Sequence, residues 1–582
     1  MTDAAPRPEL TLRAVLTGML IGALLTPCNV YSGLKIGWSF NMSIAAGLMG
    51  FGLWRLGEWA VGSAPWSIYE NNINQTAASS AASIISGGLV APIPALAMLT
   101  GQILPWPLLV VWVFVVSMLG VVVAAGLRNQ MLLRERLRFP AGVATAETIR
   151  EIHAHGKEAA RRLRVLAGGA VASGALKLLD AAATLPRLAL PIGALKAGAV
   201  PSVTAANLGF VLDPSLLMLG FGAIIGLRAG LSLLVGAIAA WGVLAPVILA
   251  QGWAQTGPAD PGASWFASLV EWLLWPGVTM MVVSALTAFA LSLLRLSWRR
   301  RTRVADPAPP TLSRRVFFTA LIATLAMASA AQVGLFGIGP WEAVLAVLLS
   351  FVLAVVAARV SGETGITPIG AMGKITQLTY SIVTPGNVTA NLMSANVTGG
   401  AAGQCADLLH DLRTGEIIGA TPRFQVVAQC FGVLTGSLVG SLVYLLLIPH
   451  PQTMLITPEW PAPAVAVWKA VAEVLAQGLQ AVPPGAVPAM AIAAVLGFAL
   501  ALAERLLPHY VTRFLPSAPA MGLAFVIPAW NSLSLFLGAA GAAAVARAAP
   551  DWTQRRLMAL AAGLVAGESL VGVALAAYSM LG

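Results

Sequence analysis

The chain carries little charge for its length. Only 10% of its 582 residues are Asp, Glu, Lys or Arg, whereas 58% are hydrophobic and the mean hydropathy is +0.83. Soluble domains carry charge on about a quarter of their residues. The composition therefore excludes an ordinary soluble enzyme and a disordered protein.

Cysteine and histidine are scarce as well. The three cysteines, Cys28, Cys405 and Cys430, are odd in number and form no CxxC pair, which excludes a disulfide framework. The five histidines show no HExxH pattern and no other zinc-ligand spacing. We therefore expect no bound metal, and metal-dependent proteolysis within the membrane has no support.

Long apolar runs are what the chain does have. A membrane-spanning helix takes about 20 residues, so the length leaves room for on the order of sixteen spans. Strands of a membrane β-barrel would instead need alternating segments of about ten residues, which are absent. The sequence predicts an all-α polytopic membrane protein with apolar windows at about 11–29, 40–61, 76–99, 104–127, 165–185, 203–226, 230–251, 266–294, 316–336, 341–360, 390–408, 424–449, 465–480, 486–506, 517–540 and 557–580.

Basic residues gather in two stretches. Of the 34 Lys and Arg residues, nine lie between Arg128 and Arg164 and seven between Arg295 and Arg315. Such clusters are typical of cytoplasmic loops, and their spacing along the predicted spans places the N-terminus on the cytoplasmic side. The clusters lack regularly interleaved aromatic residues, so we do not expect nucleic acid as a partner.

Short strings recur in the two halves of the chain. Gly226-Leu-Arg-Ala-Gly-Leu-Ser-Leu resembles Gly563-Leu-Val-Ala-Gly-Glu-Ser-Leu, and the string at Ser32 resembles one at Ser361. Recurrence in the same order indicates a duplication. An odd number of spans in each copy would make the repeats inverted, as in many transporters. We predict a first repeat over 1–251, two linking helices around a basic loop over 252–340, and a second repeat over 341–582.

Polar residues occur where spans are expected. An ionised group at mid-bilayer costs about 2.5–3.5 kcal/mol on insertion scales, so such residues must face protein or water. In the stretch from Pro65 to Ser80, polar and small residues continue at helical spacing. This pattern favours a helix that lines a cavity, with a loop at the membrane surface as the alternative. The candidates for substrate binding here are Glu70, Asn71, Asn72, Gln75 and Thr76.

The stretch from Ser361 to Pro422 is the least lipid-like part of the second half. Gly and Pro interrupt it, and broken helices at membrane depth persist where they line a cavity. Amide side chains there offer both the donors and the acceptors that a peptide backbone requires. The alternative is that these amides join neighbouring helices. The candidates for substrate binding are Lys374, Gln377, Asn387, Asn391, Asn396, Gln404 and Asp407.

Three glutamates, Glu70, Glu363 and Glu568, are candidates for proton coupling. A carboxylate withdrawn from water binds a proton more tightly, and can then exchange it near neutral pH. A structural ion pair, for instance with Lys35, Lys374 or an arginine, is the alternative for each of them.

A set of motifs follows the whole chain in a fixed order. They are Asn29-Val-Tyr-Ser-Gly-Leu-Lys-Ile-Gly37, Glu70-Asn-Asn-Ile-Asn-Gln-Thr76, Arg138-Phe-Pro-Ala-Gly-Val-Ala-Thr-Ala-Glu147, Ala406-Asp-Leu-Leu-His-Asp-Leu-Arg-Thr-Gly415, Thr421-Pro-Arg-Phe-Gln-Val-Val-Ala-Gln429, Leu515-Pro-Ser517 and Ala562-Gly-Leu-Val-Ala-Gly-Glu-Ser-Leu570. Together they resemble the oligopeptide transporter (OPT) superfamily, which includes peptide carriers and yellow stripe-like carriers of metal chelates.

This resemblance implies a carrier in the bacterial inner membrane that moves small peptides or peptide-like compounds with protons by alternating access. The proton gradient would supply the energy, with no cofactor, and Tyr31 and Lys35 of the first motif join the substrate-binding candidates. The Asn-Pro-Gly motif of the eukaryotic peptide branch is not evident, and the string at Thr384 is the nearest. Siderophore-like metal chelates are therefore the alternative substrates. Membrane lipid and further copies of the chain are the other expected partners.

A rival hypothesis is an intramembrane enzyme that acts on a lipid-linked substrate. Its best candidates are Asp407, His410 and Asp411, which share one helical face but lack a nucleophile motif. On the leading hypothesis, we expect the two polar stretches to converge on one water-filled chamber.

Overall fold

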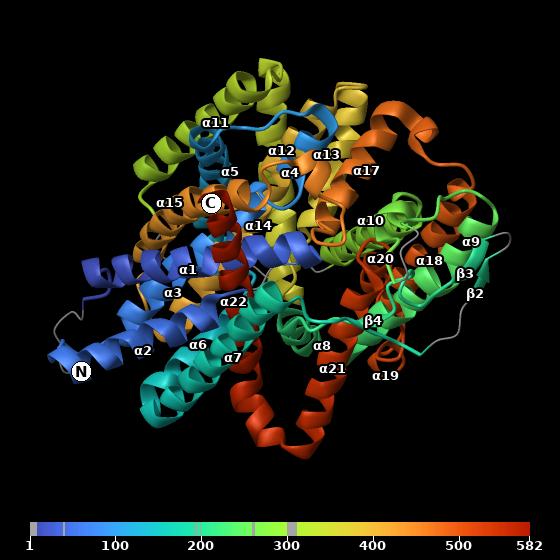
Figure 1. Ribbon diagram of the computed structural model, residues 1–582. Coiled ribbons are helices and arrows are strands. Elements are labelled where there is room, and N and C mark those ends of the chain that lie inside the picture. Colours follow the sequence, from blue (N-terminus) through green and yellow to red (C-terminus); the bar gives the residue numbers. More distant parts are fainter. Residues whose placement is uncertain are drawn as a thin grey trace.

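The computed structural model describes residues 8–38, 41–191, 195–197, 200–258, 262–298 and 311–581, which are mostly helical (Figure 1). The α-helices are α1 (Leu12–Ile36), α2 (Ser43–Val61), α3 (Ile68–Ala82), α4 (Pro92–Thr100), α5 (Trp106–Arg128), α6 (Pro140–Ala154), α7 (Gly156–Ala183), α8 (Leu216–Ala237), α9 (Ala245–Ala250), α10 (Phe266–Trp298), α11 (Arg314–Phe336), α12 (Pro340–Thr364), α13 (Ile369–Val383), α14 (Val388–Ile418), α15 (Pro422–Leu447), α16 (Pro451–Met454), α17 (Pro463–Gln477), α18 (Ala486–Leu506), α19 (His509–Thr512), α20 (Ala518–Ala524), α21 (Ala529–Ala548) and α22 (Pro550–Leu581).

Short irregular elements connect these helices. Two are 3₁₀ segments, η1 (Ser83–Gly87) and η4 (Gly478–Ala481), and two are π segments, η2 (Asn129–Arg134) and η3 (Ile238–Leu244). Four strands between α7 and α8 form two small antiparallel sheets, in which β1 (Leu188–Ala189) pairs with β4 (Val211–Leu212) and β2 (Leu195–Ala197) pairs with β3 (Val200–Val203).

Among the described residues, 12 helical segments are long and apolar enough to cross a membrane. This confirms a polytopic membrane protein built from helices, but the predicted number of spans is not reached. Windows 40–61 and 390–408 fall on α2 and α14, which are long enough but too polar. Window 465–480 falls on α17, which has only 15 residues.

The prediction of two separate spans at 203–226 and 230–251 was wrong. The chain forms strands and an extended connection up to Ser215 and then a single helical run, Leu216–Ala250. This run is kinked at Gly226, whose φ of 81° is open to glycine at little cost. The apolar residues that follow Ser215 in the two windows therefore belong to one bent helix.

The first basic cluster is not a loop, contrary to our prediction. The chain from Arg128 to Arg164 forms η2, α6 and the first turns of α7, so its charges lie mainly on helices. In the second cluster, residues 299–310 lie outside the described residues, and Arg314 and Arg315 begin α11.

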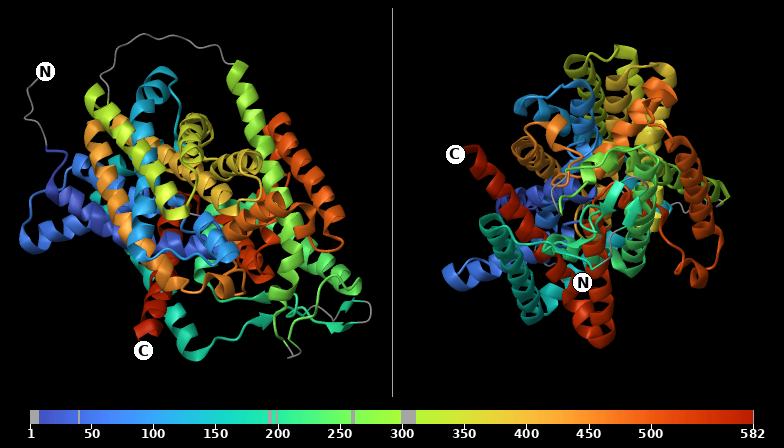
Figure 2. Two further views of the ribbon diagram at one scale, coloured as in Figure 1. Left: turned by 90° about the horizontal axis from the view of Figure 1, so that it is seen from above. Right: turned by 45° about the vertical axis from the view of Figure 1, so that its right-hand side comes forward.

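Helices from the two halves of the sequence interleave. The central helix α14 packs against α3, α5, α12, α13 and α15, and most of its residues are buried. Helix α22 packs along α7, and α21 along α8, so the C-terminal hairpin meets the first half (Figures 1 and 2). The interruptions predicted after Ser361 are present, since short breaks separate α12, α13 and α14. A 3₁₀ segment that was not predicted separates α3 from α4 within the window 76–99.

The helix α3 makes backbone-level contacts with its neighbours. A Cβ atom added at Gly432 of α15 would lie 2.2 Å from the carbonyl oxygen of Ala77, and one at Gly18 of α1 would lie 2.8 Å from the carbonyl oxygen of Asn74. Small residues permit this close approach, which is how helices associate without a hydrophobic driving force between them. The polar side chains of α3 are thereby enclosed between α1, α2, α14 and α15.

Candidate functional site

The structure does not bring the predicted residues into one chamber, which corrects that expectation. Tyr31, Lys35 and Glu568 line one cavity. Glu70 belongs to an ion-pair network, and the amides of α3, α13 and α14 bond mainly to side chains and backbone around them. A hydropathy pattern shows that polar groups are buried but not whether they face water or one another.

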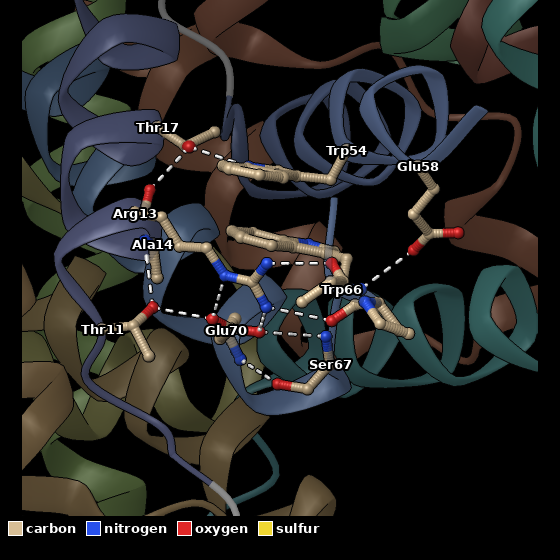
Figure 3. A network of polar contacts seen from close by, with 11 residues as sticks. Thr11, Arg13, Ala14, Thr17, Trp54, Glu58, Trp66, Ser67 and Glu70 are labelled. Atoms are coloured by element: carbon tan, nitrogen blue, oxygen red, sulfur yellow. Dashed lines mark hydrogen bonds and ion pairs between the residues drawn. The ribbon is translucent and has the colours of Figure 1, made fainter. Parts of the chain in front are cut away.

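Glu70 holds the beginning of α3 against α1 (Figure 3). Its two oxygens accept hydrogen bonds from Nε and Nη2 of Arg13, both at 2.6 Å, and from Oγ1 of Thr11 at 2.7 Å. Ser67 and Glu70 also form a capping box at the N-terminus of α3. Glu70 is only 1% exposed and lines neither of the cavities described below.

Two stacked tryptophans lie against the Arg13 guanidinium. The rings of Trp54 and Trp66 are stacked, and the Arg13 Cζ lies 4.9 Å and 5.4 Å from their centroids. Figure 3 shows the guanidinium beside the ring of Trp66 and pointing toward Glu70. This arrangement satisfies both charges and indicates a structural ion pair.

The first amide of α3 contacts a neighbouring helix. Asn71 Nδ2 lies 3.3 Å from Nε2 of His153 on α6, which is not among the candidate spans. Burial lowers the pKa of His153 to about 4, so the ring is neutral at pH 7. Asn71 therefore faces an uncharged partner.

The next turn of α3 joins α14 and α15. Gln75 Nε2 donates to Oδ1 of Asn72 at 3.3 Å and to Oγ1 of Thr76 at 3.0 Å. Gln425 Nε2 of α15 donates to Thr76 Oγ1 at 3.3 Å and to the backbone carbonyl of Asp411 at 2.6 Å. Both Gln425 and Asp411 belong to motifs of the sequence, yet neither was predicted as a site of substrate or proton binding.

Lys374 lies in a second buried polar group, between α13, α14 and α17. Its Nζ donates to Oε1 of Gln377 at 2.8 Å and lies 4.0 Å from the ring centroid of Trp468. Gln377 Nε2 donates in turn to Oδ1 of Asn391 at 3.0 Å. Within the described residues, Lys374 makes no ion pair, and the aromatic face takes the place of a carboxylate.

The other amides of α14 also bond to neighbouring helices. Asn396 accepts a hydrogen bond from the indole of Trp112 at 2.8 Å, and Gln404 donates to Ser80 at 3.1 Å. Asp407 is half-buried, with Ser83 as its hydrogen-bonding partner. These contacts match the alternative in which amides join helices.

Two candidates lie at exposed helix ends. Asn387 is the N-cap of α14 and accepts a hydrogen bond from the backbone of Ala390 at 2.9 Å. Glu363 is exposed in the last turn of α12. The structure therefore places neither of them with the buried groups.

A cavity of about 300 Å³ combines three of the predicted residues. Tyr31 and Lys35 enter it from α1 and Glu568 enters it from α22. Both the first and the second half contribute to its wall, and charges of both signs line it. The other charged or aromatic lining residues are Lys177, Asp180, Arg187, Asp213, Glu459 and Trp530.

Most charges of this cavity are already engaged. Glu568 accepts hydrogen bonds from Oγ of Ser215 and from the backbone N–H of Leu217, both at 2.8 Å, and so holds the N-terminus of α8. Arg187 pairs with Asp213 at 2.8 Å. These residues fix the wall of the cavity.

Lys35 is the cation of this cavity that has no carboxylate partner within the described residues. Its ammonium group donates to the backbone carbonyl of Glu459 and lies 4.7 Å from the ring centroid of Trp460. Lys35 is half-buried and lines the cavity, so a ligand anion can reach its ammonium group while the rest of the side chain is held by its neighbours.

A larger cavity of about 1040 Å³ lies between α10, α17 and the segments that follow α9 and η4. Trp253, Trp272 and Trp275 line it, together with the ion pair of Lys469 and Glu473 at 2.6 Å. None of the predicted site residues lines it. Its walls come from connecting segments and exposed helix faces, where polar residues give no distinctive sequence signal.

The described residues contain no group of three or more His, Cys, Asp or Glu side chains that could hold a metal ion. The trio of the rival enzyme hypothesis is also dispersed. His410 Nε2 lies 3.0 Å from Oγ of Ser361, whereas Asp411 faces Ser43 on α2.

Comparisons with known proteins cover almost the whole chain. The family model described as OPT oligopeptide transporter protein matches residues 9–578. A Saccharomyces cerevisiae protein whose name assigns it to the oligopeptide transporters, YGL114W, is 25% identical over 75% of this chain and 77% of its own. The metal-nicotianamine transporter YSL2 of Arabidopsis thaliana is 25% identical over 97% of this chain and 92% of its own. The iron-phytosiderophore transporter yellow stripe 1 of Zea mays is 24% identical over 97% of this chain and 89% of its own.

Proposed function

Because this chain belongs to the OPT oligopeptide transporter family, whose members are transporters and not enzymes, we propose that it is a secondary active carrier of a small zwitterionic compound. The substrate would be a peptide-like molecule or a metal chelate, and a proton gradient would drive its symport. The observation that carries this proposal is the cavity of about 300 Å³ with charges of both signs between the two halves.

The chemistry of this cavity suits a ligand with both a carboxylate and an ammonium group. Lys35 would bind the carboxylate, because its ammonium has a backbone acceptor but no acidic partner in the described residues. Asp180 and Glu459 would face the ammonium group, and Tyr31 would pack against the body of the ligand. A volume of about 300 Å³ lies at the lower end of the range of small-molecule sites.

The names of relatives support two substrate classes. One relative is named as an oligopeptide transporter, and others are named as carriers of metal-nicotianamine or iron-phytosiderophore complexes. In the second class the metal would enter as cargo inside its chelator, which agrees with a cavity lined by charged and aromatic side chains.

Transport would follow alternating access, with the two halves of the chain exposing the cavity to one side at a time. Repeats over 1–251 and 341–582 stay a prediction. The same holds for an N-terminus on the cytoplasmic side, for the bacterial inner membrane and for homo-oligomers. The two basic clusters support that orientation, since positive charge favours the cytoplasmic side even on helices.

A ligand screen tests this function directly. Purified protein is melted in detergent with short peptides, metal-free chelators and their metal complexes, because a ligand that binds the native state raises its melting temperature. Compounds that stabilise the protein are then tested for uptake into proteoliposomes with and without an imposed pH gradient. Absence of uptake for every stabilising compound would contradict a carrier function.

A further inference from the structure

A second acidic residue, Asp411 of α14, lies deep in the protein without a cation. It is 2% exposed, and within the described residues it forms no ion pair. Oγ of Ser43 in α2, which also donates to Ser79 at 2.8 Å, lies 3.3 Å from its Oδ1, and the side chain of Gln75 in α3 is a further hydrogen-bond partner of the carboxyl group. Asp411 thus joins helices of the first half to a helix of the second.

Two buried oxygen atoms at Asp411 have no hydrogen-bond donor among the described residues. They are Oδ2 of Asp411 itself and Oε1 of the neighbouring Gln75, which is fully buried. A buried acceptor without a donor costs about 1–3 kcal/mol, and more when it is charged. One proton on the carboxyl group removes the charge and adds the donor that is missing.

The charged groups on the packed helices favour the neutral form. Asp407 lies one turn earlier on α14, and its negative charge disfavours a second anion at Asp411. His410 turns away, with its Nε2 at 3.0 Å from Ser361. On α3, the charge of Glu70 is compensated by its ion pair with Arg13.

The positive groups nearest to this part of α14 have other partners. Arg413 of α14 pairs with Glu416, and Arg150 of α6 donates to the backbone carbonyl of Ile417. His153 of α6 contacts Asn71, and Lys374 of α13 bonds to Gln377 and faces Trp468. No basic side chain of the described residues therefore compensates Asp411.

We infer that Asp411 is the proton-binding site through which the carrier couples to the pH gradient, an inference that rests on the proposed symport function. In the described state the carboxyl group is protonated and closed off between α2, α3 and α14. Loss of the proton leaves an anion that needs water or new donors, so it favours a state in which these helices separate and admit water. Substrate binding in the cavity between α1 and α22 is linked to this proton when it favours the same separation of helices.

The test compares Asp411→Asn with a matched control, Asp551→Asn, whose side chain is exposed at the start of α22. A labelled compound that raised the melting temperature in the ligand screen serves as the probe. Its uptake into proteoliposomes is measured with and without a pH gradient, and exchange of its labelled for its unlabelled form is measured without one. We expect the ratio of uptake with to uptake without the gradient to fall to about one in Asp411→Asn, while exchange persists and the control keeps the wild-type ratio. A wild-type ratio in Asp411→Asn would overturn the inference, as would uptake driven by a sodium gradient in place of the pH gradient.

Infrared spectroscopy of the purified protein gives a readout that needs no substrate. We expect the protonated carboxyl band at neutral pH to be weaker in Asp411→Asn than in the wild type by the intensity of one carboxyl group, and an unchanged band would overturn the inference even if no transported compound is found. If Asp411→Asn does not fold, Ser43→Ala replaces it. Loss of the Ser43 donor disfavours the anion, so the pH midpoint of gradient-driven uptake should move upward, and an unchanged midpoint would contradict the assignment.

Discussion

The ion pair of Glu70 and Arg13 is predicted to stabilise the fold, and Glu70→Gln tests this. The substitution keeps the shape of the side chain but removes the charge that receives two 2.6 Å hydrogen bonds from Arg13. Removing one partner of a buried ion pair costs about 3–5 kcal/mol. Arg13 is 26% exposed, so water recovers part of that loss, and we expect a decrease of about 2–3 kcal/mol in the free energy of unfolding.

The measurement is equilibrium unfolding in mixed detergent micelles, with a double-mutant cycle that includes Arg13→Met. The pair should show a coupling energy of about 1.5–3 kcal/mol, as expected for charge-assisted hydrogen bonds. The control is Glu416→Gln, which breaks the more exposed ion pair with Arg413 and should cost less than about 1 kcal/mol. A loss for Glu70→Gln no larger than that of the control would refute the reasoning.

Three further predictions concern the cavity, the packing of α3 and the acid range. Lys35→Ala should weaken binding of a carboxylate ligand about 10- to 100-fold by titration calorimetry, since such a hydrogen bond is worth about 1.5–3 kcal/mol, whereas the exposed Lys157→Ala should not. Gly432→Val should lower the melting temperature markedly, because its Cβ would meet the backbone of α3, and a wild-type melting temperature would contradict this contact. The folded protein holds the pKa of His153 at about 4, below its unfolded value of about 6.5. The unfolded chain therefore binds the extra proton first, so stability should fall between about pH 6.5 and pH 4, and melting scans of His153→Gln should show a smaller fall.

The sequence predicted the helical membrane fold because long apolar runs have few other solutions. It could not predict the path of the chain near residue 215. A strand, an extended connection and a bent helix can have the same mean hydropathy as two membrane-spanning helices. The hydropathy of the sequence therefore does not show that the helix begins only after Ser215 and is kinked at Gly226. Short breaks of the central helices were predictable, since Gly and Pro mark them directly.

The candidate site was predicted in part. Tyr31, Lys35 and Glu568 share a cavity, but the amides expected beside them bond to other helices. A buried amide satisfies either a substrate or a neighbouring helix, and the sequence does not distinguish the two. Asp180 and Glu459 were missed because charges in connecting segments and near helix ends are common and give no signal of a cavity.

The close contact of α3 with α1 and α15 restricts how this protein can change shape. Where backbone meets backbone, a sideways shift of a fraction of a turn drives atoms into each other, and only a displacement by a whole turn restores the fit. These three helices consequently travel as one block during a transport cycle. On the proposed alternating access, we expect the movement that exposes the cavity to either side of the membrane where this block borders α2, α5, α14 and α22.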